Sequence, residues 1–352
     1  MQQSQKAVRV LFITSHYPPS DHGWGLMQLC EEVADGLFAK GHQITVLTST
    51  YGSNGETPHP YPVHRLLSID PDWYGDKPGA LQFFMGRRQR EQQAVASLRQ
   101  LVSEFRPHMI FVWDFLGLSR VMLQQAEQMP NLPVAYYMAN FLPELDDEYM
   151  EYWDRTPHHW ASKLAKLPLA KLALHMLARE GKPISLQYDN VVCVSDYLRR
   201  RLVSEGSVSS NAVVIYNGVD LTRFDPESFP ARPPTPGAFR CVVIGRVVPE
   251  KGLHTAIEAW GLLREREELN GTKLTILGDG PAGYMAQLRE RVAHLQLHDS
   301  VKFSPPIPRE QIPEALSSYD LLILPSEYAE PLARAMQEAM AMGLLVIGTT
   351  TG

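Results

Sequence analysis

Short runs of aliphatic and β-branched residues alternate along the chain with longer segments in which apolar residues recur every three or four positions. The short runs have the length of buried strands, and the longer segments have the spacing of helices with one apolar face. This alternation is typical of βαβ units around a parallel sheet. In the first half the predicted strands are Val8–Ile13, Ile44–Thr48, Met109–Trp113, Val134–Tyr137, Val191–Val194 and Val213–Tyr216. The predicted helices are Leu26–Lys40, Leu81–Phe105 and Ser195–Ser204.

A proline-rich stretch then divides the chain. Residues 225–237 contain five prolines, which cannot continue a helix or a central strand and so predict a stiff linker. A second series follows, with strands Cys241–Ile244, Leu274–Leu277, Val301–Phe303, Leu321–Leu324 and Leu345–Ile347 and helices Leu253–Glu267, Ala282–Gln296, Arg309–Ser318 and Leu332–Met342. The sequence therefore predicts an α/β protein with two doubly wound domains, 1–224 and 238–352. The last strand ends in an unfinished loop, so we expect the second domain to be incomplete.

Two glutamates lie eight positions apart around the start of the last predicted helix. Glu330 is on the loop before this helix, and Glu338 lies about 12 Å further along at about 1.5 Å per residue. A nucleotide-sugar lying across this end of the helix could offer its hexose to one carboxylate and its ribose to the other. Glutamates at this spacing also occur often by chance, and taken alone Glu338 would more simply be a solvated residue opposite the apolar face.

Two cations lie on the loop after the first strand of the second domain, in Gly245-Arg246-Val-Val-Pro-Glu250-Lys251-Gly252. A strand-to-helix loop of this kind suits a phosphate, because the charges add to the positive helix N-terminus. The planar guanidinium of Arg246 and the ammonium of Lys251 would contact it differently. The alternative is a surface loop in which Arg246 pairs with Glu250.

A glycine-rich turn after the next strand, Gly278-Asp-Gly280-Pro-Ala-Gly283, has the G-x-G-x-x-G spacing of dinucleotide-binding proteins. It supplies a competing hypothesis, an NAD-dependent oxidoreductase. Two details count against it. Asp279 would put a carboxylate beside the pyrophosphate, and the following strand ends in Ser304 where an acid should bind the ribose.

Several of these segments together resemble the donor-site signature of the retaining GT-B glycosyltransferases of family 4 (glycosyltransferase group 1). They are Pro325-Ser, Glu330-Pro, Glu338-Ala-Met-Ala-Met-Gly and the strand that follows. The resemblance extends over nearly the whole chain, and its strongest motifs lie after residue 190. It implies two Rossmann-like domains facing across a cleft, the first on the acceptor side and the second binding a nucleotide-sugar. The implied activity is transfer of a hexose from a UDP- or GDP-sugar to a hydroxyl acceptor, with retention of configuration.

The resemblance also implies roles for individual residues. Arg246 and Lys251 would stabilise the leaving diphosphate, and Glu330 would fix the donor hexose; these three form the expected catalytic group. Glu338 would bind the ribose. The remaining residues expected at the donor are Gly23, Gly245, Gly278, Gly280, Pro331, Leu332 and Ala333.

On the acceptor side the chain departs from the family. The family usually has adjacent glycines after the first strand, whereas Trp24 separates Gly23 from Gly25. After strand Val134–Tyr137 the family often has a histidine, and this chain has Asn140, which can donate a hydrogen bond but cannot act as a base. We expect Trp24 and Asn140 to face the acceptor, and the missing base favours a front-face mechanism. A non-catalytic sugar-nucleotide-binding or scaffold protein remains the alternative.

Composition narrows the picture further. With 44% hydrophobic and 20% charged residues the chain is typical of a soluble globular protein, and a net charge of −6 argues against a nucleic-acid partner. Cys30, Cys193 and Cys241 are far apart in or beside apolar runs, which predicts buried thiols. No run approaches the ~20 apolar residues of a membrane span. These features predict a cytoplasmic protein.

Neither the histidines nor the acids show metal-ligand spacing, so we expect no metal and no cofactor, the nucleotide-sugar being a substrate. Residues 160–179 are basic, leucine-rich and free of acids. They could lie on an anionic membrane surface, which would place the protein at the inner face of a membrane with a lipid-linked acceptor. The alternative, which we favour, is a core-packing helix with solvated lysines that is interrupted at Pro168.

Overall fold

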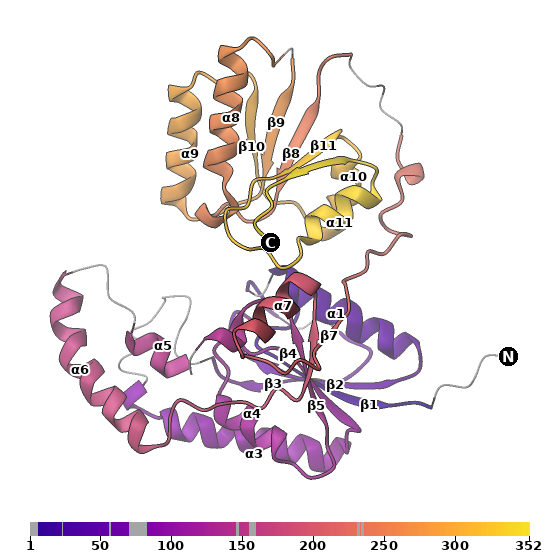
Figure 1. The fold of residues 1–352 in the computed structure, drawn as a ribbon. Helices are drawn as coiled ribbons and strands as arrows, with labels where there is room; N and C mark the ends of the chain where they lie inside the picture. The colour runs from indigo at the N-terminus through magenta and orange to yellow at the C-terminus, as the bar shows by residue number, and fades with distance from the viewer. Residues whose placement is uncertain are drawn as a thin grey trace. The chain divides into compact units, whose positions relative to one another are not determined.

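The computed structural model describes residues 6–352 apart from 23, 56–57, 70–82, 146–147, 155–159, 231–232, 234–235 and 270. The chain forms two compact units, unit 1 (Met1–Ile215) and unit 2 (Tyr216–Gly352). Each unit has a parallel sheet with helices (Figure 1). The predicted α/β class with two doubly wound domains is therefore confirmed.

The described part of unit 1 contains a parallel sheet in the order β3-β2-β1-β4-β5-β6-β7. Its strands are β1 (Arg9–Thr14), β2 (Gln43–Ser49), β3 (Val63–Leu67), β4 (Met109–Asp114), β5 (Val134–Met138), β6 (Asn190–Cys193) and β7 (Val213–Val214). All six strands predicted for the first domain are present. The sequence did not predict β3, because this edge strand buries only its last residue, Leu67, and so lacks an apolar run.

The helices of unit 1 are α1 (Trp24–Ala39), α3 (Arg87–Phe105), α4 (Arg120–Glu127), α5 (Glu148–Asp154), α6 (Trp160–Arg179) and α7 (Asp196–Ser204), with a 3-10 turn η1 (Leu142–Glu144). The Ser195 hydroxyl accepts a hydrogen bond from the Leu198 N–H at 3.2 Å and forms the N-cap of α7. Helix α6 continues through Pro168, so the predicted interruption is wrong; the fixed φ of proline is compatible with a helix.

In unit 2 the strand order is β10-β9-β8-β11-β12. The strands are β8 (Arg240–Ile244), β9 (Lys273–Leu277), β10 (Val301–Ser304), β11 (Leu321–Leu324) and β12 (Leu345–Gly348). The helices are α8 (Leu253–Glu265), α9 (Ala282–His294), α10 (Ile312–Leu316) and α11 (Arg334–Ala341), with 3-10 turns η2 (Pro226–Ser228), η3 (Pro249–Lys251) and η4 (Arg309–Gln311). Helices α8 and α9 lie on one side of the sheet and α10 and α11 on the other (Figure 1).

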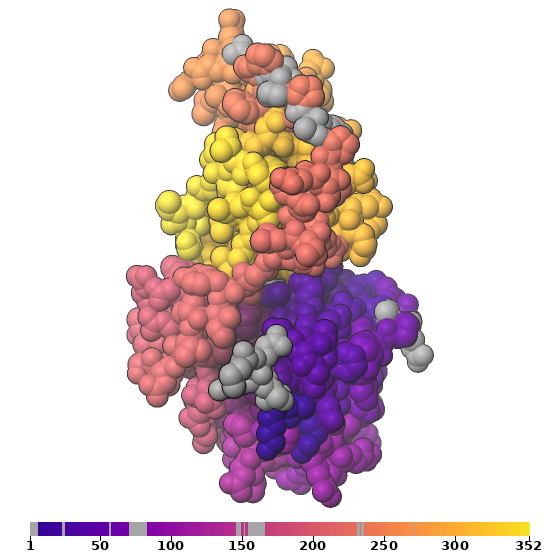
Figure 2. Space-filling view, turned by 90° about the vertical axis from the view of Figure 1, so that its right-hand side faces the viewer, coloured from indigo at the N-terminus to yellow at the C-terminus, as the bar shows by residue number. Residues whose placement is uncertain are grey.

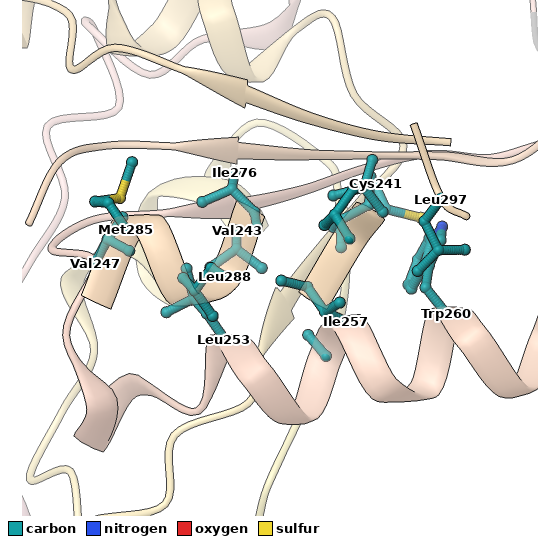
Figure 3. Close-up of a cluster of buried hydrophobic side chains, with 14 of the residues drawn as sticks. Cys241, Val243, Val247, Leu253, Ile257, Trp260, Ile276, Met285, Leu288 and Leu297 are labelled. Atoms are coloured by element: carbon teal, nitrogen blue, oxygen red, sulfur yellow. The ribbon is translucent and has the colours of Figure 1, made fainter. Parts of the chain in front are cut away.

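Alternating side chains of the central strands build two cores in unit 2. Cys241 and Val243 of β8 lie on the side of α8, where they pack in one cluster with Ile257 and Trp260 (Figure 3). Leu288 of α9 belongs to the same cluster. Val242 belongs to the opposite core, which α10 and α11 cover. Because both faces are covered, the strands of this sheet read as continuous apolar runs, which is why the sequence predicted them.

The segment before β8 belongs to unit 2. The sequence places the end of the first domain at residue 224, whereas the units divide before Tyr216. Phe224 is 2% exposed and packs in the same core as Leu322, with Phe229 of the predicted linker against it. Burial of these two aromatic side chains anchors the start of the proline-rich stretch to unit 2. In Figure 2 this segment, in salmon, lies against the yellow C-terminal part of the same unit.

Candidate functional site

The strand order of unit 2 reverses between β8 and β11. From β8 the chain proceeds to β9 and β10 on one side of the sheet, and then returns to β11 and β12 on the other. In doubly wound sheets, ligands bind outside the carboxyl ends of the strands at such a reversal. The predicted donor residues Arg246, Lys251 and Glu330 all lie on the loops that follow β8 and β11.

Two glycines bring the loops after β8 and β9 into close contact. A Cβ on Gly278 would lie 1.9 Å from the Gly245 carbonyl oxygen, and a Cβ on Gly280 would lie 1.8 Å from the Val247 carbonyl oxygen. The Val247 N–H also donates to the Asp279 carbonyl oxygen at 2.8 Å. Gly278 and Gly280, the first two glycines of the G-x-G-x-x-G turn, are therefore required for packing of backbone against backbone, whereas Gly283 has open space around it.

The loop after β8 also contacts the loop after β11. Gly252 has a φ of +64°, and a Cβ there would lie 1.9 Å from the Pro325 carbonyl oxygen. The Glu327 N–H donates to the Glu250 carbonyl oxygen at 3.0 Å. These contacts hold Lys251, the last residue of η3, beside the residues that precede α11.

Lys251 and Glu330 form an ion pair across the reversal point. The Lys251 Nζ lies 2.5 Å from Glu330 Oε1, and the Ser326 hydroxyl donates to Glu330 Oε2 at 2.7 Å. The side chains of Lys251 and Glu330 are only 22% and 17% exposed. Burial, then the Glu330 carboxylate, raises the pKa of Tyr328 to about 12, and the Tyr328 ring lies 5.1 Å from the Lys251 Nζ. This part of the site therefore has a fixed cation and a fixed carboxylate side by side.

The predicted ribose ligand, Glu338, is in a different environment. It lies on α11 and is 5% exposed, so the alternative of a solvated residue is wrong. Its Oε1 is 2.5 Å from Arg309 Nη1 and 3.7 Å from Arg334 Nε. The structure thus pairs Glu330 with Lys251 and Glu338 with two arginines.

The start of α11 also lies at the carboxyl ends of the unit 2 strands, the edge of the sheet where the predicted donor residues gather. The helix begins at Arg334 and not at Leu332 as predicted, because Ala333 is still extended. No side chain caps the helix at Ala333, so the first-turn N–H groups can serve an anion. Pro331, Leu332 and Ala333 are partly exposed and lead into this N-terminus.

Several residues of the edge were not predicted. His254 Nε2 lies 3.0 Å from Glu327 Oε1, and the Tyr284 hydroxyl lies 2.9 Å from His254 Nδ1. Ser326 also contacts Glu330, and Arg309 contacts Glu338. Only Ser326 had a signal in the sequence, since it is part of the Pro-Ser motif; Arg309 is far from Glu338 along the chain.

Unit 1 has a corresponding reversal between β1 and β4. Thr14 of β1 pairs with Asp114 of β4, and the Ser15 hydroxyl donates to the Leu116 carbonyl oxygen at 2.8 Å. Burial raises the pKa of Asp114 to about 6, and burial together with His22 lowers the pKa of His16 to about 4. Neither Asp114 nor His16 was predicted.

The predicted residues of unit 1 are placed only in part. Gly23 lies outside the described residues, and Trp24 is the first residue of α1. Asn140 Oδ1 accepts a hydrogen bond from the Leu142 N–H at 3.2 Å, so its carbonyl group helps to start η1.

Helix α6 has one buried face and one exposed face over its described side chains. Ala173 and Leu177 pack against Phe83, Tyr149 and Trp153, in agreement with the core-packing alternative. Away from this buried side the helix exposes leucines and basic residues, namely Leu167, Leu169, Lys171, Leu172 and Arg179. No helix in the part of the chain that the structure describes has the length and apolar character needed to cross a membrane.

Comparison with known proteins identifies the family. The profile of "Glycosyltransferase Family 4" matches residues 25–223, more than half of the chain. The chain belongs to the family 4 glycosyltransferases. The profile of "Glycosyl transferases group 1" matches residues 226–352. Membership of this family rules against the competing hypothesis of an NAD-dependent oxidoreductase.

Two curated relatives illustrate the range of this glycosyltransferase family. One is WcaL of Escherichia coli (strain K12), which carries the name of a colanic acid biosynthesis glycosyltransferase; it is 33% identical over 166 residues, 46% of this chain and 39% of the relative. The other is the GDP-mannose-dependent alpha-(1-6)-phosphatidylinositol monomannoside mannosyltransferase of Mycolicibacterium smegmatis, 29% identical over 202 residues, 53% of this chain and 49% of the relative. The chain thus spans less than half the length of either.

Solved glycosyltransferase structures share the fold over almost the whole chain. A glycosyltransferase from Rickettsia africae superimposes with a TM-score of 0.65 at 16% identity, covering 99% of this chain and 80% of that one. HepE of Anabaena, solved in complex with UDP and glucose, gives a TM-score of 0.61 at 18% identity, covering 98% and 81%. The fold is the GT-B fold, as the sequence predicted.

Among the described residues, no three His, Cys, Asp or Glu side chains are grouped so that they could hold a metal ion. The three cysteines are buried free thiols, as predicted.

Proposed function

We propose that the protein is a retaining glycosyltransferase that moves a hexose from a UDP- or GDP-sugar to a hydroxyl acceptor without a metal ion. The observation that carries this proposal is the ion pair of Lys251 and Glu330 at the reversal point of unit 2. It puts a cation suited to a diphosphate next to a carboxylate suited to sugar hydroxyls. Exposed Arg246 follows β8 on the same edge.

The proposed chemistry is a front-face displacement. The bond between the anomeric carbon and the diphosphate oxygen breaks, and the acceptor oxygen forms a bond to the same face of that carbon. The acceptor proton passes to the departing diphosphate, so no protein base is needed. Lys251 and Arg246 stabilise the negative charge that develops on the diphosphate. The N–H groups at the start of α11, after Pro331, Leu332 and Ala333, add to that stabilisation.

The carboxylates take separate parts of the donor in this proposal. Glu330 accepts hydrogen bonds from hexose hydroxyls, and its neighbour Ser326 fixes its orientation. Glu338 accepts hydrogen bonds from the ribose. Support for the nucleotide comes from relatives, since HepE was solved with UDP and the mycobacterial relative is named as GDP-mannose-dependent.

The acceptor belongs to unit 1 in this proposal, beside Trp24 and Asn140. A lipid-linked acceptor would suit the exposed leucines and cations of α6, which could rest on an anionic membrane surface at its inner face. The name of the mycobacterial relative includes phosphatidylinositol monomannoside, which supports the proposal of a lipid-linked acceptor. Buried free thiols suit a reducing cytoplasm.

Ligand binding followed by a turnover assay tests the proposal. Thermal-shift and calorimetric titrations with UDP, GDP and NAD should show that UDP or GDP stabilises the protein and that NAD does not. Stabilisation by NAD alone, or by none of the three, would contradict the proposed donor site. Binding of the nucleotide-sugar without any turnover in the presence of lipid and sugar acceptors would favour a non-catalytic binding protein.

A further inference from the structure

Glu338 is held by arginines from two separate elements. Arg309, in η4 after β10, approaches Glu338 Oε1 at 2.5 Å, and Arg334, one turn earlier on α11, approaches the same oxygen at 3.7 Å. The Glu338 side chain is 7% exposed and that of Arg309 is 18% exposed. A carboxylate this deeply buried requires a charged partner, and Arg309 is the nearer one.

The position of Arg309 is itself fixed. Its guanidinium lies over the ring of Phe224, 5.3 Å from the centroid, and Phe224 is anchored in the core that α10 and α11 cover. A guanidinium over an aromatic face gains a cation–π interaction and loses freedom to follow a moving partner. Arg309 is therefore a rigid support for the carboxylate.

The geometry of the contact leaves one oxygen for another partner. The closest approach of each arginine is to Oε1, where the charges pair without hydrogen-bond geometry. A carboxylate has about four lone-pair sites on its two oxygens. An arginine on Oε1 thus orients the group without occupying the second oxygen.

We propose that Arg309 is a positioning residue of the nucleotide site, holding Glu338 through Oε1 so that Oε2 accepts hydrogen bonds from the ribose hydroxyls. This inference rests on the proposed function, since it assumes a nucleoside diphosphate at this edge. Loss of Arg309 would let the carboxylate turn toward Arg334 and away from the ribose. Loss of Arg309 should therefore weaken binding of nucleotides that carry the ribose 2′-hydroxyl and should not weaken binding of those that lack it.

A double-mutant cycle tests the inference directly. Calorimetry would compare wild type, Arg309→Gln, Glu338→Gln and the double variant with whichever of UDP or GDP binds, and with its 2′-deoxy counterpart. We expect Arg309→Gln to weaken the ribonucleotide about tenfold, the range for loss of a hydrogen bond to a charged group, and the deoxynucleotide less than about twofold. In the Glu338→Gln background, Arg309→Gln should add almost nothing, because coupled residues are not additive.

Two further variants control for a general effect of removing a positively charged side chain from unit 2. Arg289→Gln is the matched control, because it removes an arginine that lies over Phe303 in the same unit, 5.4 Å from the ring centroid, and it should leave both affinities unchanged. Arg309→Lys keeps the charge but not the planar fork, so it should weaken the ribonucleotide less than Arg309→Gln does. If Arg309→Gln does not fold, the affinities of Arg309→Lys for the ribonucleotide and the deoxynucleotide still test the role of Arg309. A loss confined to the ribonucleotide would support that role, and an equal loss for both would contradict it.

The possible outcomes separate this inference from the proposed function. Equal weakening of both nucleotides, full additivity with Glu338→Gln, or no change at all would overturn the role of Arg309 while the nucleotide site stands. A folded wild type that binds neither UDP nor GDP would overturn the proposed function and this inference together.

Discussion

Unit 1 and unit 2 have the same reversal of strand order, but the groups at the two reversal points differ in charge. Between β8 and β11, unit 2 holds Lys251 and Glu330 as an ion pair. Between β1 and β4, unit 1 holds Asp114 and His16, and burial disfavours the charged form of each, since it raises the pKa of the acid and lowers that of the base. The same topology therefore places an ion pair at the reversal point of one unit and two groups with disfavoured charged forms at that of the other.

The difference follows from how each edge is built. In unit 2 the cation and the carboxylate are on different loops and neutralise each other at a partly exposed surface. In unit 1, His16 is 2% exposed, and burial and then the nearby His22 lower its pKa, so its charged form is disfavoured. Predictions that perturb one edge and spare the other test this contrast.

The largest effect is expected where the edge of unit 2 depends on close backbone contact. Gly280→Ala would place a Cβ 1.8 Å from the Val247 carbonyl oxygen and should lower the free energy of unfolding of unit 2 by about 3 kcal/mol. Urea unfolding followed by the fluorescence of Trp260, which lies in the core of unit 2, measures the loss.

Gly283→Ala is the control for this variant. It falls in α9 with nothing within 4 Å of the added methyl, so stability should stay the same or rise by up to about 1 kcal/mol. Equal stability of Gly280→Ala and wild type would mean that the two loops can separate freely.

Removal of the cations of unit 2 should affect the nucleotide next most strongly. Lys251→Ala or Arg246→Ala should weaken binding of UDP or GDP by ~1.5–3 kcal/mol each, the range for charge-assisted hydrogen bonds. Calorimetry measures the change, with Lys273→Ala at the amino end of β9 as the control. Unchanged affinity in both variants would remove these cations from the donor site, and an equal loss in Asp114→Asn would remove the contrast between the two edges.

The two carboxylates of unit 2 should separate binding from turnover. Glu338→Gln should weaken the intact donor and the free nucleotide alike, by about 1–2 kcal/mol, because a ribose contact is the same in ground and transition states. Glu330→Gln should leave the free nucleotide nearly unchanged and lower kcat, because its partner is the sugar that reacts. The reverse pattern would mean that the donor lies the other way along α11.

The contact of Lys251 with Glu330 could be anticipated from the sequence, because both follow strands whose carboxyl ends meet at one edge of a parallel sheet. The contact of Glu338 with Arg309 could not, because it depends on how η4 and α11 pack around the core that contains Phe224. Asp114 was missed for a similar reason, since its burial depends on neighbouring strands and loops. The roles of Gly23, Trp24 and Asn140 remain predictions.

A smaller effect is expected from the acid of unit 1. The folded pKa of Asp114, about 6, lies above its ordinary value of 3.8, so the folded state binds more protons than the unfolded state between these values. Stability is therefore lost as the pH rises through about 6. Asp114→Asn lacks this loss and should gain about 1 kcal/mol over wild type between pH 5 and pH 8.

Urea unfolding of wild type and variant at the two pH values measures this gain as a difference of differences. The lowered pKa of His16 acts in the opposite direction, since stability falls as the pH drops below its ordinary value of 6.5, but it is present in both proteins and cancels. A difference that does not depend on pH would show that Asp114 ionises as freely in the folded unit as in water.

The smallest effect is expected from metal removal, and it tests whether the charges of unit 2 suffice for a diphosphate. If Lys251, Arg246 and the start of α11 meet that charge, the affinity for UDP or GDP in excess EDTA should stay within about twofold of its value in magnesium or manganese, because fixed donors already supply the stabilisation that a divalent ion would add. Donor turnover should survive EDTA to the same extent. Binding or turnover that returns only when manganese or magnesium is restored would show that the edge of unit 2 cannot hold a diphosphate by its own cations, and the electrostatic contrast with unit 1 would then depend on an ion.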